Sequence, residues 1–212
     1  MKQLIFPSIM AKNQKELDQF LRKLKGTAKE LHFDVTDGKF VHSKYFRFDF
    51  RLSEEFSYNA HLLIKNPRRW VEKYGNKVDT IIFHPEPLKK DEIISLIKKI
   101  KNKKKKVGLA LKPETRVKSV ENYLNLVDYL LVLTVHPGFY GGKFLSASLK
   151  KIKEIKKINP KVKVIVDGGM APDTIKLAKK AGADLFVSGS YVTTAEKPKE
   201  RIRTLVSAIK GL

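Results

Sequence analysis

The sequence contains no cysteine. This absence excludes disulfide bonds and thiolate metal sites, so any bound metal has to use nitrogen and oxygen ligands. Long apolar runs are missing as well, because none reaches the roughly 18 residues that a membrane-spanning helix needs. The first residues run directly into a predicted strand, without the apolar run and cleavage site of a signal peptide. We therefore expect a cytoplasmic protein with no membrane association.

Acidic residues are few relative to basic ones. The 212-residue chain carries 44 Lys and Arg against 22 Asp and Glu, which gives a formal net charge of +22. Such an excess of positive charge favours the binding of polyanions such as nucleic acid, because binding releases counterions. However, no aromatic residues interleave with the basic runs, and no helix-turn-helix or zinc-finger motif is present. We interpret the charge as a lysine-rich solvated surface and expect no specific nucleic-acid partner.

Short apolar runs alternate with amphipathic segments along the chain. The runs are rich in aliphatic and β-branched residues with little polar alternation, which is typical of parallel strands buried on both faces. We predict strands at Gln3–Ile9, Ala28–Asp34, Tyr58–Leu63, Asp79–His84, Lys106–Leu111, Tyr129–Val135, Val162–Asp167 and Asp184–Ser188. From the helical spacing of apolar residues we predict helices at Glu16–Lys25, Pro67–Tyr74, Asp91–Ile100, Val117–Asn125, Leu145–Ile158, Pro172–Ala181 and Pro198–Ile209.

This alternation predicts an α/β protein, a single (β/α)8 TIM barrel with parallel strands. We see no domain boundary and expect residues 1–212 to form one domain. The second crossover, Gly38–Phe56, is aromatic-rich and weakly helical, so we expect a loop there with at most one short helix. In such barrels the chemistry gathers at the carboxyl ends of the strands. The residues that end each predicted strand are therefore the candidates for a site.

Four candidate metal ligands lie at or near such ends. His32 and Asp34 close the second predicted strand, His61 lies in the third and Asp167 ends the seventh. Residues two apart on a strand point the same way, so His32 and Asp34 can face one centre together. Imidazole nitrogens with carboxylate oxygens suit zinc, manganese, iron or cobalt, and two carboxylates beside a metal can also move protons. The combination indicates a metalloenzyme.

Glycine-rich turns follow three of the strands. They are Gly141-Gly142, Gly168-Gly169 and Gly189-Ser190. The last two follow the seventh and eighth strands, where barrels commonly bind phosphate through backbone N–H groups and a helix N-terminus. The alternative is that glycine simply permits tight turns there.

Other polar residues at strand ends leave two interpretations open. His84 and Glu86 either orient a metal ligand or form a salt-linked loop. His136 either contacts a substrate or is an exposed loop residue. For Asp37, three residues after Asp34, we expect hydrogen bonds to backbone N–H groups of the following loop.

Taken together, the motifs resemble one family, the ribulose-phosphate 3-epimerases. The second-strand motif Leu31–Val41, LHFDVTDGKFV, carries the resemblance most strongly. Seven further motifs continue it in order: Pro7–Ile9, Ala60–Leu63, Phe83–Glu86, Gly108–Pro113, Thr134–Phe139, Val166–Gly169 and Val187–Ser190. The similarity runs almost end to end, and the ordered set is far more specific than any single motif.

The resemblance implies a role for each matching residue. The metal ligands would be His32, Asp34, His61 and Asp167, holding one divalent ion per chain, with Asp34 and Asp167 as the acid–base pair. The residues implied to bind substrate, phosphate cradle and covering loop included, are Ser8, His61, Gly141, Gly142, Gly168, Gly169, Gly189 and Ser190.

The activity implied is epimerisation at C3 of a ketose phosphate, ribulose 5-phosphate to xylulose 5-phosphate in the pentose phosphate pathway. Two carboxylates would exchange protons with an enediolate intermediate. The family is commonly oligomeric, which implies a homo-oligomer. A hexulose-phosphate 3-epimerase acting on allulose 6-phosphate is an alternative. A phosphosugar aldolase or decarboxylase is disfavoured, because these enzymes place lysine where this chain has Thr36. A non-catalytic polyanion-binding barrel is disfavoured too, because it would not need the intact ligands.

Several positions depart from the family pattern. Thr36, Leu63 and Leu133 stand where methionine is usual, and Lys112 replaces an asparagine. Tyr140 puts a bulky ring beside the predicted phosphate loop. None of these changes removes a ligand or a proton carrier. They bear on the substrate and the rate more than on the chemistry.

Overall fold

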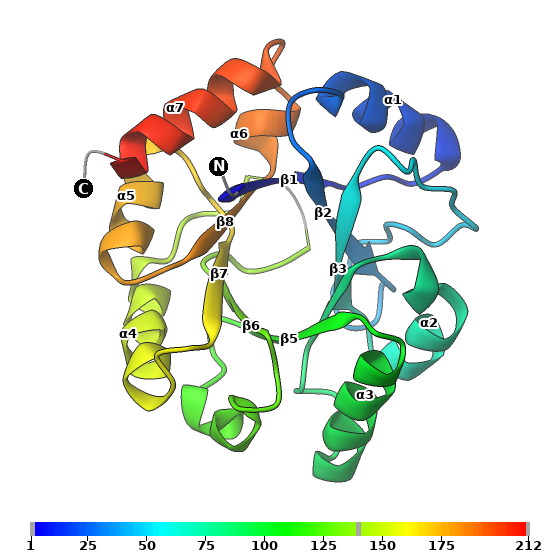
Figure 1. Cartoon of the computed structure of the whole chain (residues 1–212), viewed down its shortest axis with the longest axis vertical. Helices are drawn as coiled ribbons and strands as arrows, with labels where there is room; N and C mark the ends of the chain where they lie inside the picture. Colours follow the sequence, from blue (N-terminus) through cyan, green and yellow to red (C-terminus); the bar gives the residue numbers. More distant parts are fainter. Residues whose placement is uncertain (1–2, 139–140, 211–212) are drawn as a thin grey trace.

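Eight parallel strands close into a barrel in the computed structural model, which describes residues 3–138 and 141–210. Each strand pairs with its neighbours in the chain, and β1 closes the ring by pairing with β8. Figure 1 shows the strands at the centre and the helices around them. The strands are β1 Ile5–Ile9, β2 Glu30–Thr36, β3 Ser57–Leu63, β4 Thr80–Phe83, β5 Lys106–Leu111, β6 Tyr129–Leu133, β7 Lys163–Asp167 and β8 Leu185–Ser188. The predicted fold class is confirmed.

Helices form the outer layer. They are α1 Gln14–Leu24, α2 Pro67–Tyr74, α3 Lys90–Asn102, α4 Leu149–Ile158, α5 Pro172–Lys180, α6 Ser190–Thr193 and α7 Pro198–Lys210, with short 3₁₀ turns at Gly75–Lys77, Val117–Ser119, Glu121–Tyr123 and Ser146–Ser148. Caps explain several helix starts: the Asn13 side chain accepts from the Glu16 N–H before α1, and Asn66 does the same for Arg69 before α2.

The helix predicted at Val117–Asn125 is wrong, because this segment forms two 3₁₀ turns instead. Val117, Val120 and Tyr123 are all buried and recur every third residue. A 3₁₀ helix has three residues per turn, so it places all three on one side. The short helix α6 was not predicted.

The crossover between β2 and β3 contains no helix in its described residues, all of 37–56. Aromatic side chains cover the strands instead. Phe46 and Phe50 are buried, and their rings lie 4.3 and 5.8 Å from the ring of Phe33 on β2. These aromatic rings bury the outer side of β2, as an amphipathic helix does for other strands of the barrel.

The barrel interior holds both an apolar cluster and polar side chains. Its apolar cluster comes from β1 and β4 to β8: Phe6, Ile82, Ala110, Leu131, Leu133, Ile165, Leu185 and Val187. On β2, Leu31, Phe33 and Val35 belong to the outer core, so the alternating residues His32 and Asp34 face inward. Polar groups of β2 and β3 therefore gather at one side of the barrel mouth.

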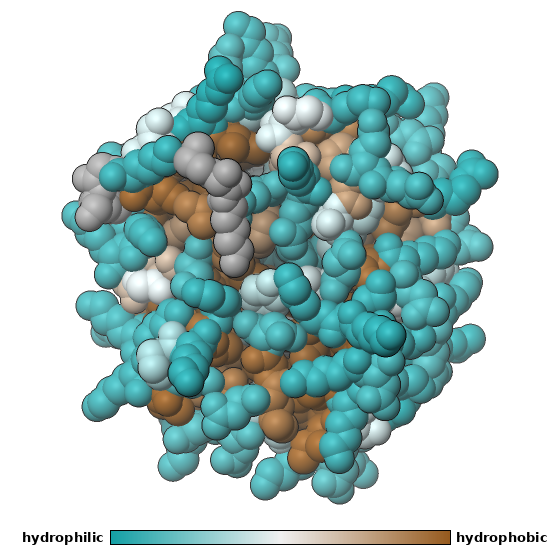
Figure 2. Space-filling model, viewed as in Figure 1, coloured by the Kyte–Doolittle hydropathy of each residue, from teal (hydrophilic) through white to brown (hydrophobic). Residues whose placement is uncertain are grey.

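The surface agrees with the charge of the chain. Figure 2 shows hydrophilic side chains over most of one face of the molecule. No helix in the described part of the chain is long and apolar enough to cross a membrane.

Candidate active site

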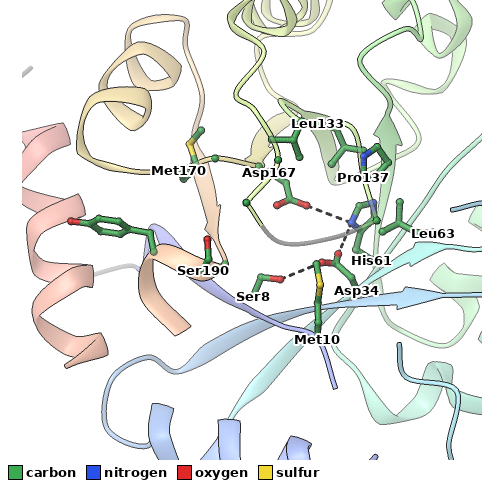
Figure 3. Close-up of a pocket in the computed structure, with 18 of the residues that line it drawn as sticks. Ser8, Met10, Asp34, His61, Leu63, Leu133, Pro137, Asp167, Met170 and Ser190 are labelled. Atoms are coloured by element: carbon green, nitrogen blue, oxygen red, sulfur yellow. Dashed lines mark hydrogen bonds and ion pairs between the residues drawn. The ribbon is translucent and has the colours of Figure 1, made fainter. Parts of the chain in front are cut away.

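The four candidate ligands meet at the carboxyl end of the barrel. Strand register places Asp34 on β2 opposite His61 on β3, and Asp167 is the last residue of β7. One ligand atom from each of His32, Asp34, His61 and Asp167 lies within 4.8 Å of the others. The two histidine side chains are fully buried, and 14% of the Asp167 side chain is exposed. Sequence positions far apart thus form one compact cluster, and Figure 3 shows three of its members, Asp34, His61 and Asp167.

Within the cluster each histidine turns one ring nitrogen toward both carboxylates. His61 Nδ1 lies 2.9 Å from Asp34 Oδ1 and 3.6 Å from Asp167 Oδ2. His32 Nε2 lies 3.4 Å from Asp34 Oδ1 and 3.9 Å from Asp167 Oδ2. The Ser8 hydroxyl donates to Asp34 Oδ2 at 3.3 Å. Ser8 therefore helps to fix the orientation of this carboxylate.

A divalent metal ion fits these residues. Neither ring nitrogen of His32 has a hydrogen-bond partner within the described part of the chain, although the ring is buried. A buried polar atom without a partner costs about 1–3 kcal/mol. A cation among the four ligand atoms would give His32 Nε2 a partner and would offset the two carboxylate charges. Two imidazole nitrogens and two carboxylates suit zinc, manganese, iron or cobalt.

Charges in the cluster stabilise one another. Burial favours the neutral form of the Asp34 carboxyl, but the His32 and His61 rings outweigh it and hold the pKa of Asp34 well below its ordinary value. Burial likewise disfavours protonated His61, but Asp167 and Asp34 raise its pKa to about 9. Asp34 is thus ionised at neutral pH. A cation that binds at His61 Nδ1 must displace a proton from it.

One cavity of about 410 Å³ opens over the cluster, a size typical of small-molecule sites. It is lined by Asp34, Asp167 and all eight residues implied to bind substrate, namely Ser8, His61, Gly141, Gly142, Gly168, Gly169, Gly189 and Ser190. In Figure 3, Ser190 lies across the cavity from His61. Sequence reasoning missed the further lining residues Met10, Val135, Met170, Tyr191 and Thr194. Met10, Met170 and Tyr191 each directly follow a motif and Val135 lies within one, which was the available signal; Thr194 lies four residues beyond the last motif and had none.

The departures from the family pattern lie at different places. Thr36, Leu63 and Leu133 all line the cavity. The Thr36 hydroxyl accepts a hydrogen bond from the Tyr45 N–H at 2.7 Å, which ties β2 to the crossover loop. Lys112 places its ammonium 3.8 Å from the centre of the Phe40 ring. Tyr140, predicted to crowd the phosphate loop, lies outside the described residues.

Three polar residues near the site have clear local partners. Asp37 Oδ1 accepts from the backbone N–H groups of Lys39 and Phe40, both at 2.8 Å, which confirms its predicted role in the loop. His136 is exposed and pairs with Glu114 at 3.0 Å. His84 is buried and contacts His61 directly.

Gly168 is required for the shape of the cavity wall. Its φ is +113°, and a Cβ placed there would lie 2.5 Å from Val135 Cγ2. Gly182, with φ +104°, is the matched control, because a Cβ there meets only ordinary contacts at 3.8 Å. Both substitutions carry the strain of positive φ. We expect Gly168→Ala to lower the free energy of unfolding by about 1–3 kcal/mol more than Gly182→Ala, as overpacking does. Urea unfolding measures the difference, and equal losses would show that Val135 moves aside without cost.

Comparisons with known proteins point to one family. The family model described as "Ribulose-phosphate 3 epimerase family" matches residues 4–193. The ribulose-phosphate 3-epimerase of Candida glabrata is 32% identical over 99% of this chain and 93% of its own length. The cytoplasmic isoform from Oryza sativa subsp. japonica is 34% identical over 85% of this chain and 82% of its own length. The ribulose-phosphate 3-epimerase of Mycobacterium bovis is 33% identical over 95% and 91% respectively.

Solved structures share the fold at lower sequence identity. The 3-hexulose-6-phosphate synthase of Salmonella typhimurium superposes with a TM-score of 0.72 at 16% identity, covering 99% of both chains. KGPDC of Streptococcus mutans has a TM-score of 0.71 at 14% identity, covering 100% of this chain and 99% of its own. These similarities support the barrel fold alone.

Proposed function

The chain belongs to the ribulose-phosphate 3-epimerase family, and we propose on that basis that it is a metal-dependent isomerase that converts ribulose 5-phosphate to xylulose 5-phosphate. The observation that carries the proposal is the pair of carboxylates, Asp34 and Asp167, which share one cavity with a glycine-lined end. Both carboxylates lie beside the two buried histidines. One cavity therefore offers proton carriers, cation ligands and a phosphate-sized cradle.

Epimerisation requires a proton to leave C3, next to the carbonyl, and another to return on the opposite face. Asp34 and Asp167 project into the cavity from β2 and β7, which are not neighbouring strands. We assign one carboxylate to accept the proton from C3 while the other, protonated, donates to the opposite face. The reverse reaction exchanges their roles. Ser8 holds Asp34 Oδ2, so the carboxylate keeps a fixed direction during the transfer.

The metal would be held by His32, Asp34, His61 and Asp167. When bound, a divalent zinc, manganese, iron or cobalt ion supplies positive charge that stabilises the enediolate. The side chains themselves orient the substrate and move the protons. We propose one such ion per chain.

The phosphate group would bind at the other end of the cavity. There the proposed cradle consists of backbone N–H groups of Gly168, Gly169, Gly189 and Ser190. Val135 lies so close to Gly168 that a side chain at position 168 would collide with it in the cavity wall. Gly141 and Gly142 would fold over the bound substrate. The distance between cradle and carboxylates then selects the length of the sugar.

An allulose 6-phosphate 3-epimerase is the second candidate. Thr36 and Leu63 line the cavity where the family usually carries methionine, which can leave room for one more carbon. The relatives named above favour the pentulose. We further propose that the protein is a cytoplasmic homo-oligomer that acts in the pentose phosphate pathway. We propose that residues 1–212 form one domain and that the protein has no specific nucleic-acid partner.

Solvent exchange at C3 tests the chemistry directly. We expect the metal-loaded protein in D2O to incorporate deuterium at C3 of ribulose 5-phosphate while xylulose 5-phosphate appears, as followed by NMR. We further expect kcat/KM to favour the pentulose over allulose 6-phosphate by roughly 10–200-fold, the range that one extra carbon provides. A preference for the hexulose would change the substrate and leave the mechanism. No deuterium in either sugar would contradict the proposed function.

A further inference from the structure

The two ring nitrogens of His61 face different environments. Nδ1 points toward the carboxylates of Asp34 and Asp167, at 2.9 and 3.6 Å. Nε2 points the other way and lies 3.0 Å from Nε2 of His84, at the end of β4. Only Nδ1 can therefore reach a cation held by the cluster. The proton that His61 keeps must then be on Nε2.

A neighbouring carboxylate determines which histidine donates across this contact. His84 Nδ1 lies 3.1 Å from Glu86 Oε2, and an ionised carboxylate only accepts hydrogen bonds. His84 Nδ1–H therefore donates to Glu86. A His84 ring whose proton lies on Nδ1 leaves Nε2 as an acceptor, and the Nε2 of His61 faces it at 3.0 Å. His61 Nε2–H then donates to His84 Nε2, and the three residues form a chain with a single direction.

This hydrogen-bonded series of His61, His84 and Glu86 is held in place and shielded from water. His84 is only 1% exposed, and the Phe40 ring packs against it at 4.9 Å. The Lys112 ammonium in turn lies over the Phe40 ring, 3.8 Å from its centre. Glu86 uses its second oxygen to accept from the Lys112 backbone N–H at 3.3 Å and from the Thr115 hydroxyl. The end of β5 thus anchors the carboxylate that orients His84.

We propose that His84 and Glu86 are positioning residues that fix His61 in its Nε2–H tautomer and aim its Nδ1 lone pair at the metal site. The inference rests on the metal site of the proposed function. Neither residue lines the cavity described above, so each acts through His61 and not on the substrate. Loss of such an outer partner typically weakens metal binding by about 10–100-fold.

Zinc binding by the folded protein tests the proposal. We expect His84→Leu, measured by competition with a chromophoric chelator, to bind zinc about 10–100-fold more weakly than the unchanged protein. His84→Gln should recover most of this loss, because its amide oxygen can accept from His61 and its amide N–H can donate to Glu86. The matched control is His136→Leu, which breaks the exposed His136–Glu114 pair at the same end of the barrel. This control should bind zinc normally.

A second readout reports the tautomer itself. In ¹⁵N NMR spectra of the zinc-loaded protein we expect His61 to carry its proton on Nε2, and we expect His84→Leu to change the His61 ring shifts. If His84→Leu does not fold, Glu86→Gln decides, with Glu114→Gln as its control, because both replace a carboxylate that pairs with a histidine. Weaker zinc binding by Glu86→Gln alone supports the proposal.

Failure of the positioning role and failure of the metal site give different results. Unchanged zinc affinity and unchanged His61 shifts in folded His84→Leu, or in Glu86→Gln where that variant decides, would overturn the positioning role and leave the proposed function intact. No zinc binding by the unchanged protein would instead contradict the metal site on which the proposed function depends.

Discussion

The variants Asp34→Asn and Asp167→Asn should each turn over substrate at least about a hundredfold more slowly, in line with the loss of a positioned acid or base. An asparagine keeps the size of the side chain but cannot accept and return a proton. Asp34 is the clearer case, because its neighbours hold its pKa well below the ordinary value and keep it ionised. The measurement is kcat with ribulose 5-phosphate at saturating metal.

Metal content must be measured in the same samples, because both aspartates belong to the proposed ligand set. Asp173→Asn is a suitable control, since Asp173 is exposed in the first turn of α5. It should retain the turnover of the unchanged protein. An Asp34 or Asp167 variant with normal metal and near-normal turnover would remove that residue from the mechanism.

Chelation of the metal should abolish activity, and zinc, manganese, iron or cobalt should restore it. The structure offers one four-residue cluster in the described part of the chain, so we expect about one divalent ion per chain. Elemental analysis of purified protein and activity after dialysis against a chelator measure both quantities. Full activity in rigorously metal-free protein would contradict the assigned site.

His61→Ala extends this test to a single ligand. We expect the variant to lose its metal while the barrel still folds, because His61 lies at the mouth and is not part of the apolar interior cluster. Circular dichroism reports the fold, and metal analysis reports the loss. Normal metal content in folded His61→Ala would exclude this residue as a ligand.

The sequence by itself determined the barrel. A parallel strand buried on both faces must be apolar along most of its length, so runs such as Tyr129–Val135 could be recognised without a structure. The candidate ligands could be recognised as well, since His32, Asp34 and Asp167 stand at or near the ends of such runs. Where the local pattern fitted two structures, the prediction was wrong: the apolar spacing of Val117–Asn125 suits two 3₁₀ turns as well as an α-helix.

Only the tertiary structure decided how the ligands are oriented. His61 contacts Asp34 and His84, which lie 27 and 23 residues away in the chain. Spacing along one strand predicts which residues share a face, but it does not predict which ring nitrogen meets which neighbour. That choice depends on the register of β2, β3 and β4 and on closure of the barrel. Hydrogen bonds are directional, so the Glu86–His84–His61 chain exists only once these strands are paired.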